Sequence, residues 1–150
     1  MGQVLAEYVA DNEAARDRLF ALVDALSDED LAAEVEPGWR VSALLAHLAY
    51  WDRRYVLMLA RAKEDRLEPP DLPEWLTDVE NDALRAEWDA IPGREAVRLV
   101  REAVDAINVE VANLPNELAV DLTSRGQIHL MRRSRHRYEH IEQIEAVPRR

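Results

Sequence analysis

Three of the four histidines in this chain are placed where they could bind one divalent metal ion. His136 and His140 stand four residues apart, about one helical turn, so in a helix both imidazoles leave the same face. His47 lies in a separate segment, His-Leu-Ala-Tyr-Trp-Asp, whose pattern is also helical. Three imidazoles gathered from two helices would form an open-sided ligand set inside a helix bundle, as in catalytic rather than structural zinc sites.

An open-sided site of three histidines supports a defined range of metal chemistry. Zinc, nickel and ferrous iron all accept neutral imidazole, and the ligand set alone does not select among them. Such a metal lowers the pKa of a bound water toward neutrality or polarises an oxygen of the substrate. It also binds an external thiol as the thiolate, because coordination to a metal deprotonates thiols. The alternative interpretation is that the histidines pack in the core without a metal.

Three further side chains could contribute to such a site. Arg133 belongs to a run with four arginines, residues 131–137, and lies near the histidine edge of its helix. We therefore predict that Arg133 attracts an anionic group such as a carboxylate. His129 lies two turns before the histidine pair and is interpreted as a pocket or surface residue. Asp52 follows His47 by five residues, about 140° around a helix, so we expect it to support a ligand or face solvent.

The composition limits the classes of function. The chain has 150 residues, enough for one domain with a hydrophobic core, and we assign residues 1–150 to a single helical domain. Its 30 acidic against 19 basic residues give a formal charge of −11, which argues against nucleic acid as a partner. No apolar run suits a membrane span and the first residues do not resemble a signal peptide, so we expect a cytoplasmic protein. The lack of cysteine excludes disulfides and thiolate ligands from the chain itself.

Apolar residues that repeat in steps of three and four predict a helical protein. Glycine is scarce, and the prolines lie between the periodic stretches. The connector between the second and third long helices can reach from one end of a bundle to the other. We therefore predict an all-α four-helix bundle with a long crossover at this connector. The long helices are expected at about residues 3–26, 41–66, 94–114 and 124–147, with a short helix at about 74–89.

Some polar and aromatic residues within these helices carry expectations about packing. Asn12 interrupts the apolar stripe of the first helix, and a buried amide with a hydrogen-bond partner is favoured over a residue that faces a polar pocket. The tryptophans are expected to anchor the core and the helix junctions: Trp39, Trp51, Trp75 and Trp88. Three apolar residues lie off the predicted core face and could contact a second copy of the chain: Ile128, Met131 and Tyr138.

Other common kinds of active site find no support in the sequence. The chain contains no glycine-rich phosphate loop, no Gly-x-Ser-x-Gly elbow and no His-Glu-x-x-His motif. The paired Glu-x-x-His motifs of di-iron bundles are also absent. The three histidines therefore remain the best candidates for chemistry.

Three segments together resemble the DinB-like superfamily of small metal-binding four-helix bundles. Residues 37–52, Pro-Gly-Trp-Arg-Val-Ser-Ala-Leu-Leu-Ala-His-Leu-Ala-Tyr-Trp-Asp, are similar to its second helix. Residues 78–84, with Asn81, resemble its crossover segment, and residues 136–144 resemble its last helix with two metal histidines. Arg40 departs from the pattern, because a serine or threonine usually caps the second helix there.

The resemblance implies that His47, His136 and His140 bind one divalent metal, often zinc or nickel, in a bundle that commonly forms homodimers. Some members of the superfamily use low-molecular-weight thiols such as mycothiol or bacillithiol in transferase or isomerase reactions. Our leading hypothesis is therefore a metal-dependent enzyme for a small-molecule substrate, with a thiol-dependent transfer or isomerisation as its reaction. The alternative hypothesis is a non-catalytic, stress-associated dimeric bundle that binds a metal or ligand.

Overall fold

The long helices form because their apolar residues recur at helical spacing and leave one continuous face to bury. On α5, for example, Val100, Val104, Ile107 and Val111 follow this spacing and are all fully buried. The computed structural model describes residues 2–64 and 73–150. The elements in chain order are α1 (Gln3–Ala25), α2 (Asp28–Ala32), β1 (Glu34–Glu36), β2 (Trp39–Arg40), α3 (Val41–Lys63), α4 (Glu74–Asp89), α5 (Gly93–Ala112), α6 (Asn116–Ser124), the 3-10 helix η1 (Ile128–Leu130) and α7 (Ser134–Glu145).

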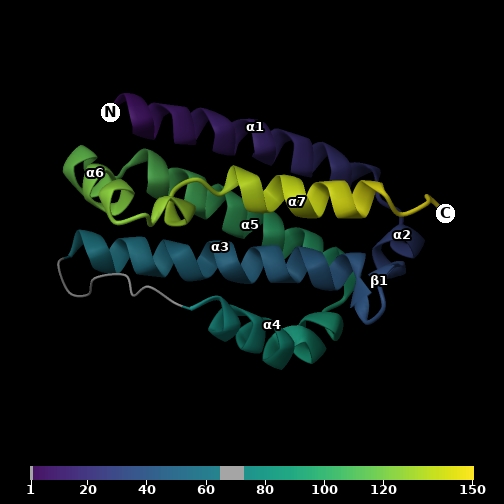
Figure 1. Cartoon of the computed structure of the whole chain (residues 1–150). Coiled ribbons are helices and arrows are strands. Elements are labelled where there is room, and N and C mark those ends of the chain that lie inside the picture. Colours follow the sequence, from purple (N-terminus) through teal and green to yellow (C-terminus); the bar gives the residue numbers. More distant parts are fainter. Residues whose placement is uncertain (1, 65–72) are drawn as a thin grey trace.

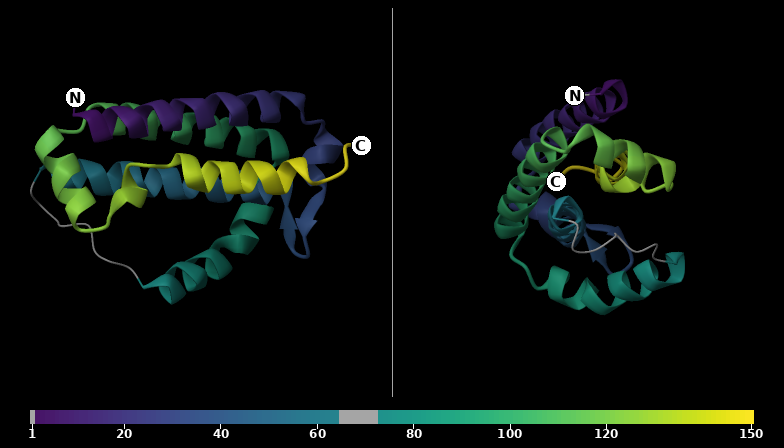
Figure 2. Two further views of the ribbon diagram at one scale, coloured as in Figure 1. Left: turned by 45° about the horizontal axis from the view of Figure 1, so that its top comes forward. Right: turned by 90° about the vertical axis from the view of Figure 1, so that its left-hand side faces the viewer.

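Four long helices, α1, α3, α5 and α7, pack lengthwise as a bundle (Figure 1). Helices α1 and α7 run in one direction and α3 and α5 run in the other. The chain therefore crosses from one end of the bundle to the other between α3 and α5, and α4 forms part of this crossover. Figure 2 shows α4 outside the four long helices, on the side of α3 that faces away from α1. The predicted all-α bundle with a long crossover is confirmed.

The core consists of two apolar clusters that occupy different parts of the bundle. Leu45, Val104 and Ile141 belong to the cluster that lies nearer to α2. Leu59 and Ile107 belong to the second cluster, which α6 and η1 help to cover. All five side chains are fully buried. This packing fixes α3 and α7 against each other, and these are the helices that carry the three histidines of interest.

A short connection with its own structure precedes α3. Ser27 and Asp30 form a capping box at the start of α2, in which each side chain accepts from the other residue's backbone N–H. Strands β1 and β2 then form a small antiparallel hairpin, and Gly38 takes the positive φ of 82° that its turn requires. The helices expected at residues 3–26 and 41–66 left the residues between them unassigned, because strands this short leave no periodic pattern. The hairpin brings Trp39 to the start of α3.

The last predicted helix, residues 124–147, is wrong over its first ten residues. The segment instead forms the end of α6, a turn and η1, and α7 begins only at Ser134. Gly126 has a positive φ of 74°, which a continuing α-helix does not allow. Because the chain before α7 is not a continuous helix, Met131 turns inward and is fully buried, so its predicted contact with a second copy is wrong.

Two other expectations are also settled by the fold. Trp51 and Trp88 are buried as predicted, but Trp75, at the start of α4, is 64% exposed and does not anchor the core. The predicted end of the second helix at residue 66 lies outside the described residues, and α3 is described to Lys63. Among the described helices, none combines the length and apolarity needed to cross a membrane.

Candidate metal centre

The three histidines singled out from the sequence converge at one point. His47 comes from α3, and His136 and His140 come from α7. The Nε2 atom of His136 lies 3.1 Å from Nε2 of His47 and 3.0 Å from Nε2 of His140. Among the described residues, these three form a group whose candidate ligand atoms all lie within 4.8 Å of one another. The predicted convergence is confirmed, and we call this group the histidine cluster.

Three tryptophan rings surround the imidazole of His47. The ring centroids of Trp39, Trp51 and Trp88 lie 5.8, 6.4 and 5.1 Å from that of His47, all with their planes steeply inclined to the imidazole. The pKa of His47 is lowered to about 3, mainly by burial and then by the charges of His140 and Arg133, while Asn81 acts in the opposite direction. The imidazole is therefore neutral at pH 7 and can offer a lone pair.

The two histidines of α7 are also neutral, and their second ring nitrogens have different partners. Burial is the main cause that lowers the pKa of His140, and it holds the pKa of His136 well below its usual value. Nδ1 of His140 lies 2.7 Å from Oε1 of Gln143, so Nδ1 carries the proton and donates to the amide oxygen. This leaves the Nε2 lone pair of His140 directed at the histidine cluster.

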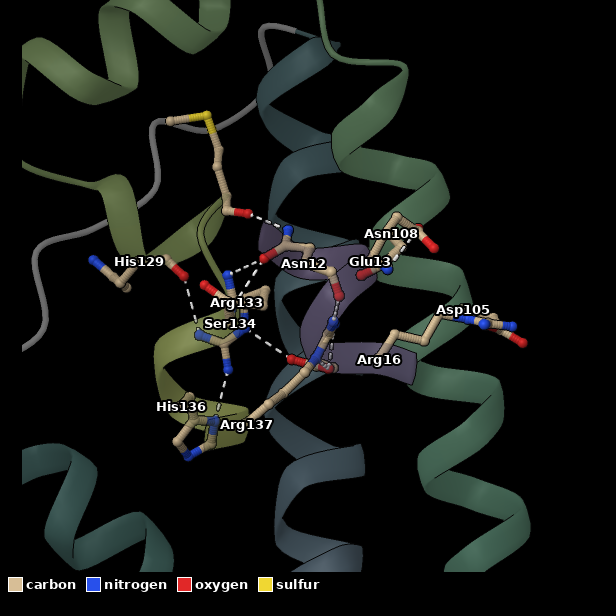
Figure 3. Close-up of polar contacts among 12 residues, drawn as sticks. Asn12, Glu13, Arg16, Asp105, Asn108, His129, Arg133, Ser134, His136 and Arg137 are labelled. Atoms are coloured by element: carbon tan, nitrogen blue, oxygen red, sulfur yellow. Dashed lines mark hydrogen bonds and ion pairs between the residues drawn. The ribbon is translucent and has the colours of Figure 1, made fainter. Parts of the chain in front are cut away.

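A buried ionic network lies behind His136 (Figure 3). The side chain of Asp52, from α3, is fully buried and accepts from Arg133 Nε at 2.8 Å and from Arg137 Nη2 at 3.1 Å. Arg133 Nη2 in turn lies 2.9 Å from Nδ1 of His136. Asp52 therefore acts on His136 indirectly, through Arg133, which corresponds to the first of its two predicted roles. The alternative role, in which Asp52 faces solvent, is wrong.

Asn12 fixes the start of α7 from the neighbouring helix α1. Its Oδ1 accepts from the backbone N–H groups of Arg133 and Ser134 at 2.8 and 3.0 Å, and its Nδ2 donates to the carbonyl of Met131 at 2.8 Å. These contacts satisfy backbone N–H groups that the start of a helix otherwise leaves without partners. The side chain of Arg133, at the N-cap position, makes no capping hydrogen bond of its own. The favoured interpretation of Asn12 as a buried, hydrogen-bonded amide is confirmed.

Arg137 is the residue of this network that the sequence analysis did not identify. Its side chain is fully buried, and Nη1 donates to the backbone carbonyl of Asn12 at 2.9 Å. A pattern in the sequence could have identified it, because positions 134, 137, 141 and 144 follow helical spacing and Ile141 and Ile144 are apolar. An arginine on an apolar stripe requires a buried anion, and Asp52 was the available candidate.

A cavity opens beside the histidine cluster. It has a volume of about 420 Å³ and lies between α3, α4, α7 and the β1–β2 hairpin. Trp51 and Tyr55 form one wall, and Asn81 of α4 accepts from Trp51 Nε1 at 2.9 Å. His129 lines the cavity, as its predicted pocket role required, but is not part of the histidine cluster. A small molecule in this cavity would reach the side of the cluster that the protein leaves open.

The match to a family model decides the relationship of this chain. The model that describes the mycothiol maleylpyruvate isomerase N-terminal domain matches residues 13–136, more than half of the chain. The chain belongs to this family. The family is part of the DinB/YfiT-like superfamily, as the sequence resemblance implied. Comparisons with curated proteins and with solved structures give no match.

The match to the mycothiol maleylpyruvate isomerase N-terminal domain family includes only part of the site. His47 and His136 lie inside the matched residues, and His140 lies four residues beyond them. Asp52 and Arg133 are also inside, so the ionic network behind His136 lies mostly within the family domain. The role of His140 therefore depends on its own geometry, on its Nε2 distance of 3.0 Å to His136 and its contact with Gln143.

In this member of the family, Arg133 lies between two cavities. It lines the cavity of about 420 Å³ and an adjoining one of about 1070 Å³, which also share His129, His136 and Glu139. Arg133 is only 4% exposed, and each of its three nitrogens has a partner: Asp52, the carbonyl of His129 at 3.0 Å, and His136. Its predicted binding of an anionic group stays a prediction.

Proposed function

We propose that this protein is a metal-dependent enzyme that acts on a small molecule together with a low-molecular-weight thiol, in a transfer or isomerisation reaction. The observation that carries the proposal is the convergence of three neutral imidazoles through Nε2 at spacings of 3.1 and 3.0 Å. Ligands about 2.0–2.1 Å from one zinc ion are about 3–3.5 Å from each other, so the spacings suit a common divalent cation.

The chemistry of the donors supports this assignment. When a cation is bound between them, the Nε2 atoms of all three neutral imidazoles can direct a lone pair at it. Gln143 accepts from Nδ1–H of His140, which is the usual arrangement behind a metal-bound histidine. Three protein ligands leave at least one position for a substrate atom, and the cavity of about 420 Å³ lies beside it. Zinc or nickel is our first expectation and iron the next.

A thiol substrate has to come from outside the chain, because the chain contains no cysteine. A divalent metal in the cluster would bind such a thiol as thiolate and so make it nucleophilic near pH 7. The family description names mycothiol and maleylpyruvate for related proteins. In this chain, the rings of Trp51 and Tyr55 would exclude water from one side of the substrate, and Arg133 would hold a carboxylate. We propose mycothiol or a similar thiol as the co-substrate.

The test combines metal analysis with turnover. The purified protein is reconstituted with zinc or nickel, and the metal content is measured before mycothiol and maleylpyruvate are added and isomerisation is followed by absorbance. We expect about one metal ion for each chain, and loss of both metal and turnover in His47→Ala. His129→Ala, which removes a histidine outside the cluster, is expected to keep the metal.

Two outcomes would contradict the enzymatic proposal. Turnover that survives His47→Ala would show that the histidine cluster is not the active site. Metal binding without turnover across a panel of thiols and electrophiles would favour the alternative, a non-catalytic bundle that binds a metal or ligand. A homodimer, which the superfamily resemblance implies, stays a prediction and is checked by sedimentation of the same samples.

A further inference from the structure

The group behind His136 is a hydrogen-bond donor, which is unusual for a histidine that is to bind a metal. Nη2 of Arg133 lies 2.9 Å from Nδ1 of His136. A guanidinium is always protonated in proteins and can only donate. Nδ1 of His136 therefore accepts this hydrogen bond. Histidines that bind metals ordinarily donate from this second nitrogen to a carboxylate or carbonyl, as His140 does to Gln143.

This contact determines which ring nitrogen of His136 carries the proton. A neutral imidazole has one N–H, and if Nδ1 accepts, the proton is on Nε2. Nε2 is the atom that faces His47 and His140 at 3.1 and 3.0 Å. A metal at Nε2 needs the lone pair there and moves the N–H of the neutral ring to Nδ1. The two donors at Nδ1 and Nη2 would then face each other, so the Arg133 contact and the metal exclude one another.

The rest of the Arg133 side chain has anchors that do not involve His136. Nε donates to Asp52 at 2.8 Å, Nη1 donates to the carbonyl of His129 at 3.0 Å, and the guanidinium lies 4.3 Å from the ring centroid of Tyr55. A small rotation can therefore release Nη2 from His136 while the guanidinium stays in the wall between the two cavities that Arg133 lines.

The charge balance of the network favours an anion as the partner of a released Nη2. Arg133 and Arg137 bring two positive charges to the single carboxylate of Asp52, and all three residues are buried. The network thus has one positive charge more than its buried anion neutralises. A carboxylate is the anion whose planar pair of oxygens best matches a guanidinium edge.

We propose that Arg133 couples metal binding to the binding of a carboxylate. Without a metal, Nη2 of Arg133 donates to His136; when a divalent metal binds the histidine cluster, Nη2 is released and binds a carboxylate in the adjoining cavity. This inference rests on the proposed metal site and extends it. Because coupling between two sites is reciprocal, a carboxylate in the cavity strengthens metal binding by the same factor as the metal strengthens carboxylate binding.

The first test needs no variant. Protein with ¹⁵N-labelled histidine is treated with a chelator, and long-range ¹H–¹⁵N correlation spectra report which ring nitrogen of each histidine carries a proton. We expect His136 to be protonated at Nε2 and His140 at Nδ1. In Arg133→Gln, whose amide oxygen can accept a hydrogen bond, we expect the His136 proton on Nδ1. A wild-type His136 that is protonated at Nδ1 would overturn the inference.

The second test measures zinc affinity by competition with a chromophoric chelator, in sodium acetate and in sodium chloride of equal ionic strength. We expect zinc to bind wild type several-fold more tightly in acetate than in chloride. Arg133→Gln should bind zinc about tenfold more tightly than wild type in chloride and lose the acetate effect. A purely structural role for Arg133 predicts the opposite sign, because removal of a supporting residue ordinarily weakens metal binding. Arg132→Gln makes the same change at the exposed neighbour, which pairs with Asp11, and is the matched control.

The results separate this inference from the proposed function. Zinc binding that depends on His47, but that neither acetate nor Arg133→Gln changes, would overturn the coupling and leave the metal site intact. Zinc binding that does not depend on His47 would overturn the metal site and the coupling with it. Tighter binding in Arg133→Gln together with a shifted His136 proton supports the coupling, since the loss of a nearby positive charge alone does not move a proton between ring nitrogens.

Discussion

The substitution Asp52→Asn tests the buried ionic network most directly. Asparagine has nearly the same shape as aspartate but removes the negative charge that both Arg133 and Arg137 need. The three side chains are 0, 5 and 0% exposed, in the order Asp52, Arg133 and Arg137, and the two ion pairs measure 2.8 and 3.1 Å. Removing one partner of a buried ion pair costs about 3–5 kcal/mol, because the remaining charge is left without compensation. We expect a loss of about 4 kcal/mol in the free energy of unfolding.

Urea unfolding in the presence of a chelator, followed by circular dichroism, measures this loss without a contribution from metal binding. Asp11→Asn is the matched control, since Asp11 forms a 2.7 Å ion pair with Arg132, next to Arg133 in the chain, but both side chains are solvent-accessible, at 36 and 46%. An exposed pair of this kind contributes about 0–1 kcal/mol. Equal losses in the two variants, or a loss below about 1 kcal/mol in Asp52→Asn, would refute the argument that burial makes this network essential.

Three further predictions follow from individual contacts. Asn12→Ala removes the group that caps α7, so the free energy of unfolding should fall by about 1–3 kcal/mol, and urea unfolding that matches wild type would contradict this. Gln143→Leu removes the acceptor for Nδ1–H of His140, so zinc affinity in the chelator competition should fall about 10- to 100-fold, and an unchanged affinity would exclude the role assigned to Gln143. Below pH 6.5 an unfolded histidine binds a proton that folded His47 refuses down to about pH 3, so His47 alone should cost the metal-free protein about 1 kcal/mol for each pH unit in this range. Unfolding free energies measured between pH 7 and 5 should show this slope, and a slope that His47→Gln leaves unchanged would assign it to other groups.

The helix pattern and the histidine cluster could be predicted because both depend on local spacing. The apolar repeat of α5 and the four-residue step from His136 to His140 are properties of a single helix. The approach of His47 to the other two histidines could be predicted with one further assumption. This was that His47 lies on the same buried face of its helix as its apolar neighbours. That assumption held because Leu44 and Leu48, on either side of His47, are buried in the core.

The start of α7 could not be predicted because its cause lies in another helix. Residues 124–133 carry a helical pattern, and the positive φ of Gly126 and the amide of Asn12 decide where the helix begins. Asn12 is more than one hundred residues away in the chain, so no window of sequence contains both partners. The same limit applies to Arg133, whose position beside His136 was predicted but whose contact with Asp52 joins two helices.

The ring of tryptophans around His47 gives the protein an optical property that an experimenter can use. Three of the four indoles, those of Trp39, Trp51 and Trp88, lie within 6.4 Å of the imidazole of His47, whereas Trp75 is in solvent. An open-shell ion such as Cu²⁺, Ni²⁺ or Co²⁺ that binds this imidazole would quench the emission of the enclosed indoles and leave that of Trp75 as a constant background. Intrinsic fluorescence is therefore a label-free reporter of occupancy, and closed-shell Zn²⁺ can be followed by its displacement of a quenching ion.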